Sequence, residues 1–192
     1  MSNSVLYMSM SLDGFIAGPD DGPGQGLGAG GEVLHGWLRD GGGDPMGYRP
    51  SGPSAAIFDE FMATGAVVVG RRTFDIAGRW NGDHHDGVPI FVPTRGEPPE
   101  PDSELVHYVT DGVESAMRQA KQAAGDANVL VHGASLAQSC LRAGVLDELE
   151  IHLIPILLGD GRRLFGDEQL ALELTRVIAA PGVTHLRYRV AS

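Results

Sequence analysis

Two arginines directly after a buried strand are the strongest chemical signal in the sequence. Residues 66–69 form an apolar, largely β-branched run bounded by glycines, which predicts a strand buried on both faces. At Gly70 the absence of a Cβ lets a ligand approach the backbone. Arg71, Arg72 and Thr73 then offer two guanidinium groups, a hydroxyl and the free N–H groups of a helix start, which together suit phosphate groups. The alternative is that both arginines are solvated and Thr73 only caps the helix.

A second turn of the same kind follows the apolar run 129–131. His132 and Gly133 lead into small residues at the start of a helix, so the backbone amides of Gly133, Ala134 and Ser135 could hold a pyrophosphate. Parallel strands end at the same edge of a sheet, where ligands bind in α/β folds, so two such turns suit a dinucleotide. The alternative is an ordinary tight turn capped by Ser135.

Two other patterns are set aside. Residues 26–31 satisfy G-x-G-x-x-G, but they do not follow a strand, so they are not a Rossmann fingerprint. His84 and His85 lie between two aspartates, but adjacent residues on an extended loop point apart. An exposed polar loop is therefore expected there, and no metal site is predicted. The other histidines show no spacing signal.

Composition restricts the class of protein. The 192 residues suit one domain over 1–192, and one cysteine, Cys140, excludes a disulfide within the chain. The net charge of −11, from 25 acidic and 14 basic residues, argues against nucleic-acid binding and against adsorption to an anionic membrane. The N-terminus does not resemble a signal peptide, and no apolar stretch is long enough to span a bilayer. A cytoplasmic protein with a small-molecule ligand is expected.

The order of elements predicts an α/β fold. Strands alternate with helices first and a strand pair comes last, which predicts a mainly parallel sheet covered by helices, with an antiparallel C-terminal edge. Glycine and proline concentrate in residues 18–53, which we interpret as a loop insertion beside the active site, with a helical turn at 32–38 that packs Trp37. The expected strands are 5–10, 66–70, 89–92, 105–109, 129–131, 149–158, 172–178 and 183–190, and the expected helices are 54–64, 111–124 and 136–143.

Two local patterns give finer predictions. Leu149, Ile151 and Leu153 alternate with Glu150 and His152, which is typical of a strand covered on one face only. The spacing of Asp111 and Glu114 predicts a capping box at the start of the helix 111–124.

Motifs along most of the chain resemble a known family. Residues 11–17 are similar to the signature S-L-D-G-x-I-A, and 70–74 to G-R-x-T-[FWY]. Residues 141–149 and 154–165 resemble L-x-x-x-G-L-[VI]-D-E-L followed by P-x-L-L-G-x-G-x-x-L-F. On these motifs the chain is identified as a member of the dihydrofolate reductase-like superfamily, in the branch of the riboflavin-biosynthesis reductase C-terminal domain.

The resemblance implies a three-layer α/β/α fold that binds NADPH along the C-terminal strand edges, and a homodimer. Residues 13–17, which end at Ala17, would border the nicotinamide, and the loop 18–53 would form a lid. The residues implied for the rest of the cofactor are Gly70, Arg71, Arg72 and Thr73 on the pyrophosphate and 2′-phosphate, Thr94 and Arg95 near the adenosine, and Gly133, Ala134, Ser135 and Leu136 on the other side of the pyrophosphate.

The implied reaction is hydride transfer from NADPH to a small heterocyclic (pteridine- or pyrimidine-like) or carbonyl substrate. Asp13 and Asp59 are the candidate proton donors. Two departures from the family pattern matter. His132 stands where relatives carry glycine, and Asp59 and Glu60 lie closer to Gly70 than the pterin-anchoring acid would, which disfavours folate. The alternatives are a non-catalytic NADP(H)-binding module and a flavin-dependent reductase.

Overall fold

The fold is built on one eight-stranded sheet. The computed structural model describes residues 2–39 and 49–191. The strand order is β5-β4-β3-β6-β1-β7-β10-β9, and all pairs are parallel except β7–β10 and β10–β9 at the C-terminal edge. These strands are β1 (Ser4–Ser11), β3 (Ala66–Val69), β4 (Ile90–Pro93), β5 (Val106–Val109), β6 (Val129–His132), β7 (Glu148–Ile154), β9 (Leu172–Ala180) and β10 (Val183–Val190). The predicted parallel sheet with an antiparallel edge is confirmed.

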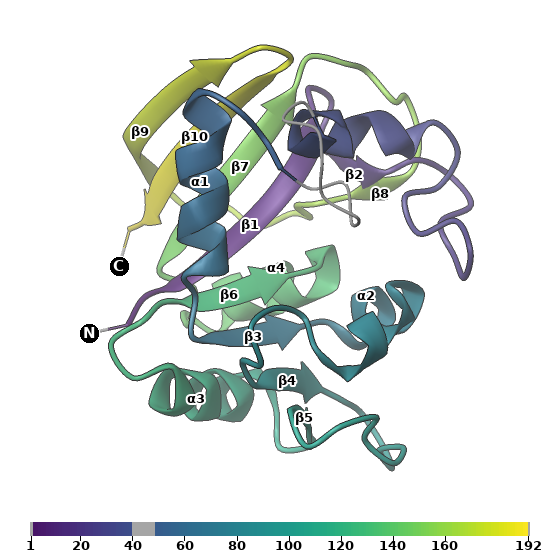
Figure 1. The fold of residues 1–192 in the computed structure, drawn as a ribbon, viewed down its shortest axis with the longest axis vertical. Helices are drawn as coiled ribbons and strands as arrows, with labels where there is room; N and C mark the ends of the chain where they lie inside the picture. The colour runs from purple at the N-terminus through teal and green to yellow at the C-terminus, as the bar shows by residue number, and fades with distance from the viewer. Residues whose placement is uncertain (1, 40–48, 192) are drawn as a thin grey trace.

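Helices cover both faces of the sheet (Figure 1). Because side chains alternate along a strand, Val67 and Val69 of β3 join a core with Phe74, while Ala66 and Val68 join a core with residues of the later helices. The first core lies under α1 (Pro53–Met62) and α2 (Arg71–Ile76), and the second lies under α3 (Val113–Ala124) and α4 (Ala134–Arg142). This is the expected three-layer α/β/α arrangement.

The glycine-rich stretch 18–53 contains regular structure in its described part. It follows β2 (Phe15–Ala17), which pairs with β8 (Arg162–Arg163), and it contains the 3-10 helix η1 (Gly31–Arg39). Trp37 of η1 is buried, as predicted for the helical turn at 32–38. The triple glycine 41–43 of the expected lid lies outside the described residues.

Two local predictions were wrong. Glu150 and His152 are buried, with 0% and 5% of their surface exposed, because α1 and η1 cover the sheet face that the alternation on β7 left open. The helix α3 begins after Gly112, and no side chain caps it, so the capping box at Asp111 does not form. The predicted end of this helix at residue 124 is confirmed, and the next residue, Gly125, has a φ of 61°, which glycine tolerates.

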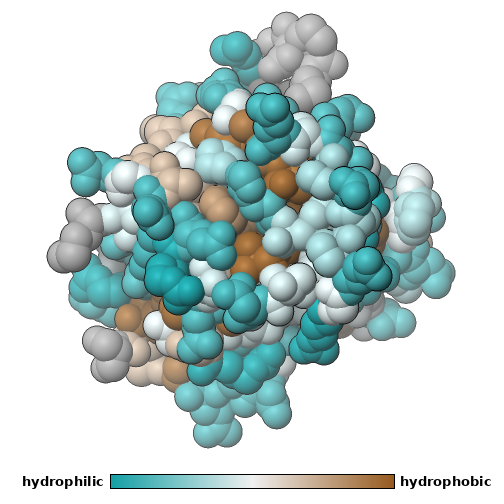
Figure 2. Space-filling model, turned by 90° about the horizontal axis from the view of Figure 1, so that it is seen from below, coloured by the Kyte–Doolittle hydropathy of each residue, from teal (hydrophilic) through white to brown (hydrophobic). Residues whose placement is uncertain are grey.

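The surface seen from below in Figure 1, toward β5 and α3, is mostly hydrophilic, with apolar residues in separate areas between polar side chains (Figure 2). Among the helices of the described ranges 2–39 and 49–191, none has the length and apolar character that crossing a membrane requires.

Candidate active site

The two predicted turns lie side by side at one edge of the sheet. Strands β3 and β6 are parallel neighbours, and Val69 pairs with His132 at their carboxyl ends. The backbone N–H of Gly70 donates to the carbonyl of His132 at 3.1 Å. Gly70 and Gly133 are the N-cap residues of α2 and α4. Neither helix has a side-chain cap, so no capping side chain occupies the first backbone N–H groups of either helix.

A large cavity opens on the α1 and α2 side of these turns. Its volume of about 680 Å³ suits a small-molecule or cofactor site. Its wall comes from β1, β2, η1, α1 and α2, and from the segment around Trp80. The expected site residues that line it are Ala17, Arg72 and Thr73. Its aromatic and histidine lining is Tyr7, His35, Trp37, Phe58, Phe61, Trp80, His84, His132 and His152.

Arg72 shares a carboxylate with a second arginine at this cavity. Its Nη2 donates to the carbonyl of Asp21 at 2.6 Å and to Oδ1 of Asp21 at 3.1 Å. Arg162 of β8 binds the same carboxylate through two bonds of 2.7 and 2.8 Å. The bonds from Arg162 and then those from Arg72 hold the pKa of the Asp21 carboxyl below its usual range. Asp21 therefore stays ionised and positions two guanidinium groups on the cavity wall.

The other expected cofactor residues lie near the turns without lining the cavity. Arg71 forms an ion pair with Asp75 at 2.7 Å, and its guanidinium lies 5.4 Å from the centre of the Tyr108 ring. Thr94 is buried, and its hydroxyl donates to the carbonyl of Val92, whereas Arg95 is exposed. Ala134, Ser135 and Leu136 form the first turn of α4, behind Gly133.

The two carboxylates expected to donate a proton do not line the cavity. Asp13 accepts bonds from the hydroxyl of Ser11 and the backbone N–H groups of Leu158 and Gly159. The bond from Ser11 is the largest cause that lowers the pKa of Asp13 to about 2. Asp13 thus ties the turn after β1 to the loop after β7. Asp59 is exposed on α1, while its neighbour Phe58 faces the cavity.

The histidines form the part of the site that the sequence did not reveal. The prediction that His84 and His85 form an exposed loop was wrong, because His85 is buried and bonds to Thr64. The ring of His84 lies 4.4 Å from Trp80 and 5.4 Å from His132, centre to centre. Desolvation lowers the pKa of His84 to about 2 and that of His132 to about 4. Both rings are therefore neutral near pH 7.

Backbone geometry brings His84 to this place. Arg79, Trp80 and Asn81 have φ values of 54°, 47° and 53°, so the chain after α2 passes through three consecutive left-handed residues. This conformation costs roughly 1–2 kcal/mol per residue, and packing of Trp80 against Phe74 and His84 offsets part of it. No periodicity in the sequence signals such a turn.

Comparisons with known proteins agree with this geometry. A protein of Shewanella sp. PV-4 assigned to riboflavin biosynthesis has a TM-score of 0.74 at 23% identity, with 100% of both chains covered. Dihydrofolate reductase from Enterococcus faecalis, solved with NADP(H), has a TM-score of 0.58 at 12% identity, with 99% of this chain and 97% of that one covered. The chain therefore has the dihydrofolate reductase-like fold.

A comparison with family models assigns the chain to one family among the proteins that share this fold. The family model of the RibD C-terminal domain matches residues 4–186, and the chain belongs to this family. The uncharacterized protein YwjB of Bacillus subtilis (strain 168) is 28% identical over 175 residues, which cover 84% of this chain and 82% of YwjB.

Proposed function

We propose that the protein is an NADPH-dependent reductase of a small heterocyclic, pteridine- or pyrimidine-like, or carbonyl substrate. One observation carries this proposal: the turns at Gly70 and Gly133 follow neighbouring parallel strands, and Arg72, Thr73 and His132 beside these glycines line a cavity of about 680 Å³. The RibD C-terminal domain family and the fold shared with a dihydrofolate reductase support the same class of reaction.

In this proposal the turns hold the phosphates of the cofactor. The uncapped N–H groups at the start of α4 suit a pyrophosphate, since a helix N-terminus favours negative charge. Arg72 offers a guanidinium to a phosphate oxygen. Its partner Asp21 is also bound by Arg162, so Asp21 keeps an ion pair when Arg72 turns to the phosphate. Ala17 then borders the nicotinamide, as the family resemblance implies.

When bound, NADPH supplies the hydride. The chain orients the acceptor between aromatic walls and excludes water, which strengthens every polar contact inside. Asp13 remains a poor proton donor at pH 7, given its pKa of about 2, and Asp59 faces away from the cavity. Beside Asp21, which two arginines hold, Glu32 is the other carboxylate among the described residues that line the cavity, and we assign it to the substrate.

The test is turnover. Purified protein with NADPH is mixed in turn with pteridines, pyrimidines and carbonyl compounds, and loss of NADPH absorbance is followed. We expect one class to be reduced, and Glu32→Gln to raise KM for it more than it lowers kcat. NADPH binding without turnover of any class would instead identify a non-catalytic module, and a yellow protein as purified would point to a bound flavin.

We also propose that the chain pairs with a second copy of itself. The edge strand β9 exposes Leu172, Leu174 and Val177, with 40%, 52% and 56% of their surfaces accessible. Apolar side chains on an edge strand, which has one side without a neighbouring strand, favour association with another chain. Light scattering on purified protein should give twice the chain mass, and Val177→Glu should give the chain mass.

A further inference from the structure

Pairing of β7 with β10 gathers three buried ligand groups. Glu150, His152 and His185 each offer one ligand atom, and these atoms all lie within 4.8 Å of one another. His185 is directly opposite His152 in the antiparallel pair, and Glu150 lies two residues before His152, so the three share one face of the sheet. The exposed fractions of their surfaces are 0%, 5% and 0%.

The two imidazoles of the cluster lie within hydrogen-bond distance of each other. Nδ1 of His152 lies 2.9 Å from Nδ1 of His185. Two nitrogens bound to one tetrahedral zinc ion, each at about 2.05 Å, are about 3.3 Å apart, so binding would replace this hydrogen bond and move the two rings apart by only about 0.4 Å. The other ring nitrogen of His185, Nε2, lies 3.0 Å from the hydroxyl of Ser54 on α1. Histidines that bind metals are commonly oriented by such a bond from the second nitrogen.

One oxygen of Glu150 lacks a partner. Oε2 accepts from Nη2 of Arg176 at 2.9 Å, but Oε1 is one of the few buried side-chain atoms in the described residues that has no hydrogen-bond partner. Leaving such an acceptor unsatisfied is costly. A cation between this carboxylate and the imidazoles would satisfy it.

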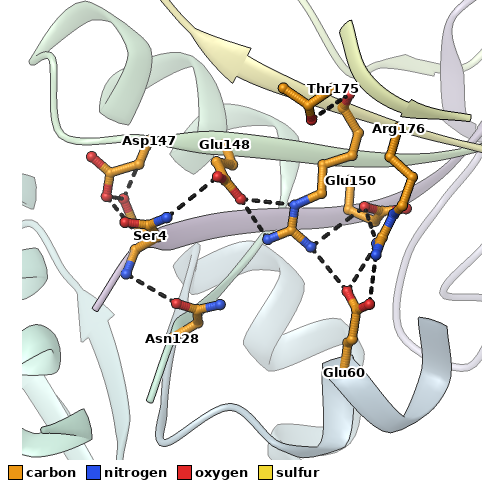
Figure 3. A network of polar contacts seen from close by, with 10 residues as sticks. Ser4, Glu60, Asn128, Asp147, Glu148, Glu150, Thr175 and Arg176 are labelled. Atoms are coloured by element: carbon orange, nitrogen blue, oxygen red, sulfur yellow. Dashed lines mark hydrogen bonds and ion pairs between the residues drawn. The ribbon is translucent and has the colours of Figure 1, made fainter. Parts of the chain in front are cut away.

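The two arginines next to the cluster are both paired with carboxylates. Arg176 and Arg187 face Glu150, but both guanidinium groups are also bound by Glu60, and Arg187 is bound by Glu148 (Figure 3). Three carboxylates thus oppose two guanidinium groups. Glu60 and Glu148 balance the two guanidinium charges, and Glu150 is the third carboxylate.

From this arrangement we propose that Glu150, His152 and His185 bind one divalent transition-metal ion of the zinc class. Two imidazole nitrogens and a carboxylate oxygen are a ligand set that zinc and its neighbours accept, with positions left open for other ligands. His152 lines the large cavity, so the ion would lie in its wall. This site does not depend on the bound nicotinamide or on the proposed reaction.

The ion itself tests the proposal. Protein stripped with a chelator is titrated with Co²⁺ alone, and the visible d–d absorption of the ion is followed together with the fluorescence of Trp37. The ring of Trp37 lies 4.5 Å from His152 and 4.9 Å from His185, so the ion should quench it. We expect saturation at one Co²⁺ per chain and displacement by Zn²⁺. A spectrum that stays that of aqueous Co²⁺, with no retained metal, overturns the proposal.

Variants identify the ligands. Glu150→Gln and His185→Gln should each weaken Co²⁺ binding at least tenfold, whereas His107→Gln, on the exposed side of β5, should not. Loss of binding in His84→Gln with retention in His185→Gln would assign the ion to the other histidine cluster and contradict the proposal. Circular dichroism without metal shows whether each variant folds. Should the ligand variants unfold, the stoichiometry and spectrum of the unaltered protein decide.

Discussion

Gly133 packs against the side chain of Thr73 so closely that no side chain larger than hydrogen fits at position 133. A Cβ built on Gly133 would stand 2.5 Å from Oγ1 of Thr73 and 3.3 Å from its Cβ. The φ of Gly133 is +101°, a conformation that residues with side chains rarely adopt. The glycine therefore lets the start of α4 pack against α2, and this contact fixes the distance between the two turns that we propose for phosphate binding.

The first prediction concerns this contact. Gly133→Ala should lower the free energy of unfolding for two reasons. Alanine is strained at the positive φ of this position, and its Cβ overpacks against Thr73, which adds about 1–3 kcal/mol. Thr73 cannot easily turn away because it is β-branched. The substitution should also weaken NADPH binding at least tenfold. Gly112→Ala is the matched control, since Gly112 precedes α3 with a φ of +102° and has nothing within 4 Å of its Cβ position. Equal losses of stability in the two variants would contradict the packing argument.

Arg72 should distinguish NADPH from NADH. A charge-assisted hydrogen bond contributes about 1.5–3 kcal/mol, so Arg72→Ala should weaken NADPH binding roughly 10- to 100-fold and NADH binding much less. Calorimetric titration with each cofactor measures both constants. Arg142→Ala is the control, because Arg142 is an exposed arginine on α4 that pairs with Glu168 outside the cavity. A loss of the same size for both cofactors would rule out contact with the 2′-phosphate.

The buried histidines should make stability depend on pH. The unfolded chain takes up protons at these rings below about pH 6.5, whereas folded His132 does so only near pH 4 and His84 near pH 2. Their contribution is thus complete above pH 6.5 and is lost as the pH falls toward these values, by up to about 1.4 kcal/mol per pH unit per ring. Urea unfolding of the protein and of His132→Gln at pH 7 and pH 5 measures it. The variant should lose less stability over this range; an equal loss would contradict the assignment.

Glu60 should anchor α1 to the antiparallel edge of the sheet. Its carboxylate accepts bonds of 2.5 and 2.8 Å from Arg176 on β9 and one of 3.0 Å from Arg187 on β10 (Figure 3). Glu60→Gln removes the ionised acceptor that the two guanidinium groups share, although each keeps a second carboxylate, and we expect a loss of about 1–2 kcal/mol in urea unfolding. Glu173→Gln, which breaks the exposed pair with Arg189, should change stability by at most about 0.5 kcal/mol. Similar effects of the two changes would count against the anchoring role.

The sheet and the two turns proposed for phosphate binding could be predicted because each is marked by residues that are close together in the sequence. Runs such as 66–69 and 129–131 are apolar throughout, and a glycine follows each strand, so both the buried parallel strands and their open ends are visible in the sequence. Their adjacency follows from the parallel topology, and the structure confirms that β3 and β6 are neighbours.

The histidine-rich cavity could not be predicted because it depends on contacts between distant segments. His152 belongs to a strand whose alternation suggested an open face, yet Trp37 and α1 cover that face. His84 reaches His132 only through the left-handed turn at residues 79–81. These polar side chains are buried by elements distant in the sequence, so the local pattern of apolar and polar residues around His84 and His152 does not reveal their burial.

The most direct measurement of the central claim is a fluorescence titration of the purified protein with NADPH and with NADH. Trp37 and Trp80 both line the cavity, so a nicotinamide cofactor bound there should quench their emission. We predict saturable quenching at one NADPH per chain, with weaker binding of NADH. Absence of saturable quenching by either cofactor would contradict the claim that the turns at Gly70 and Gly133 form a dinucleotide site.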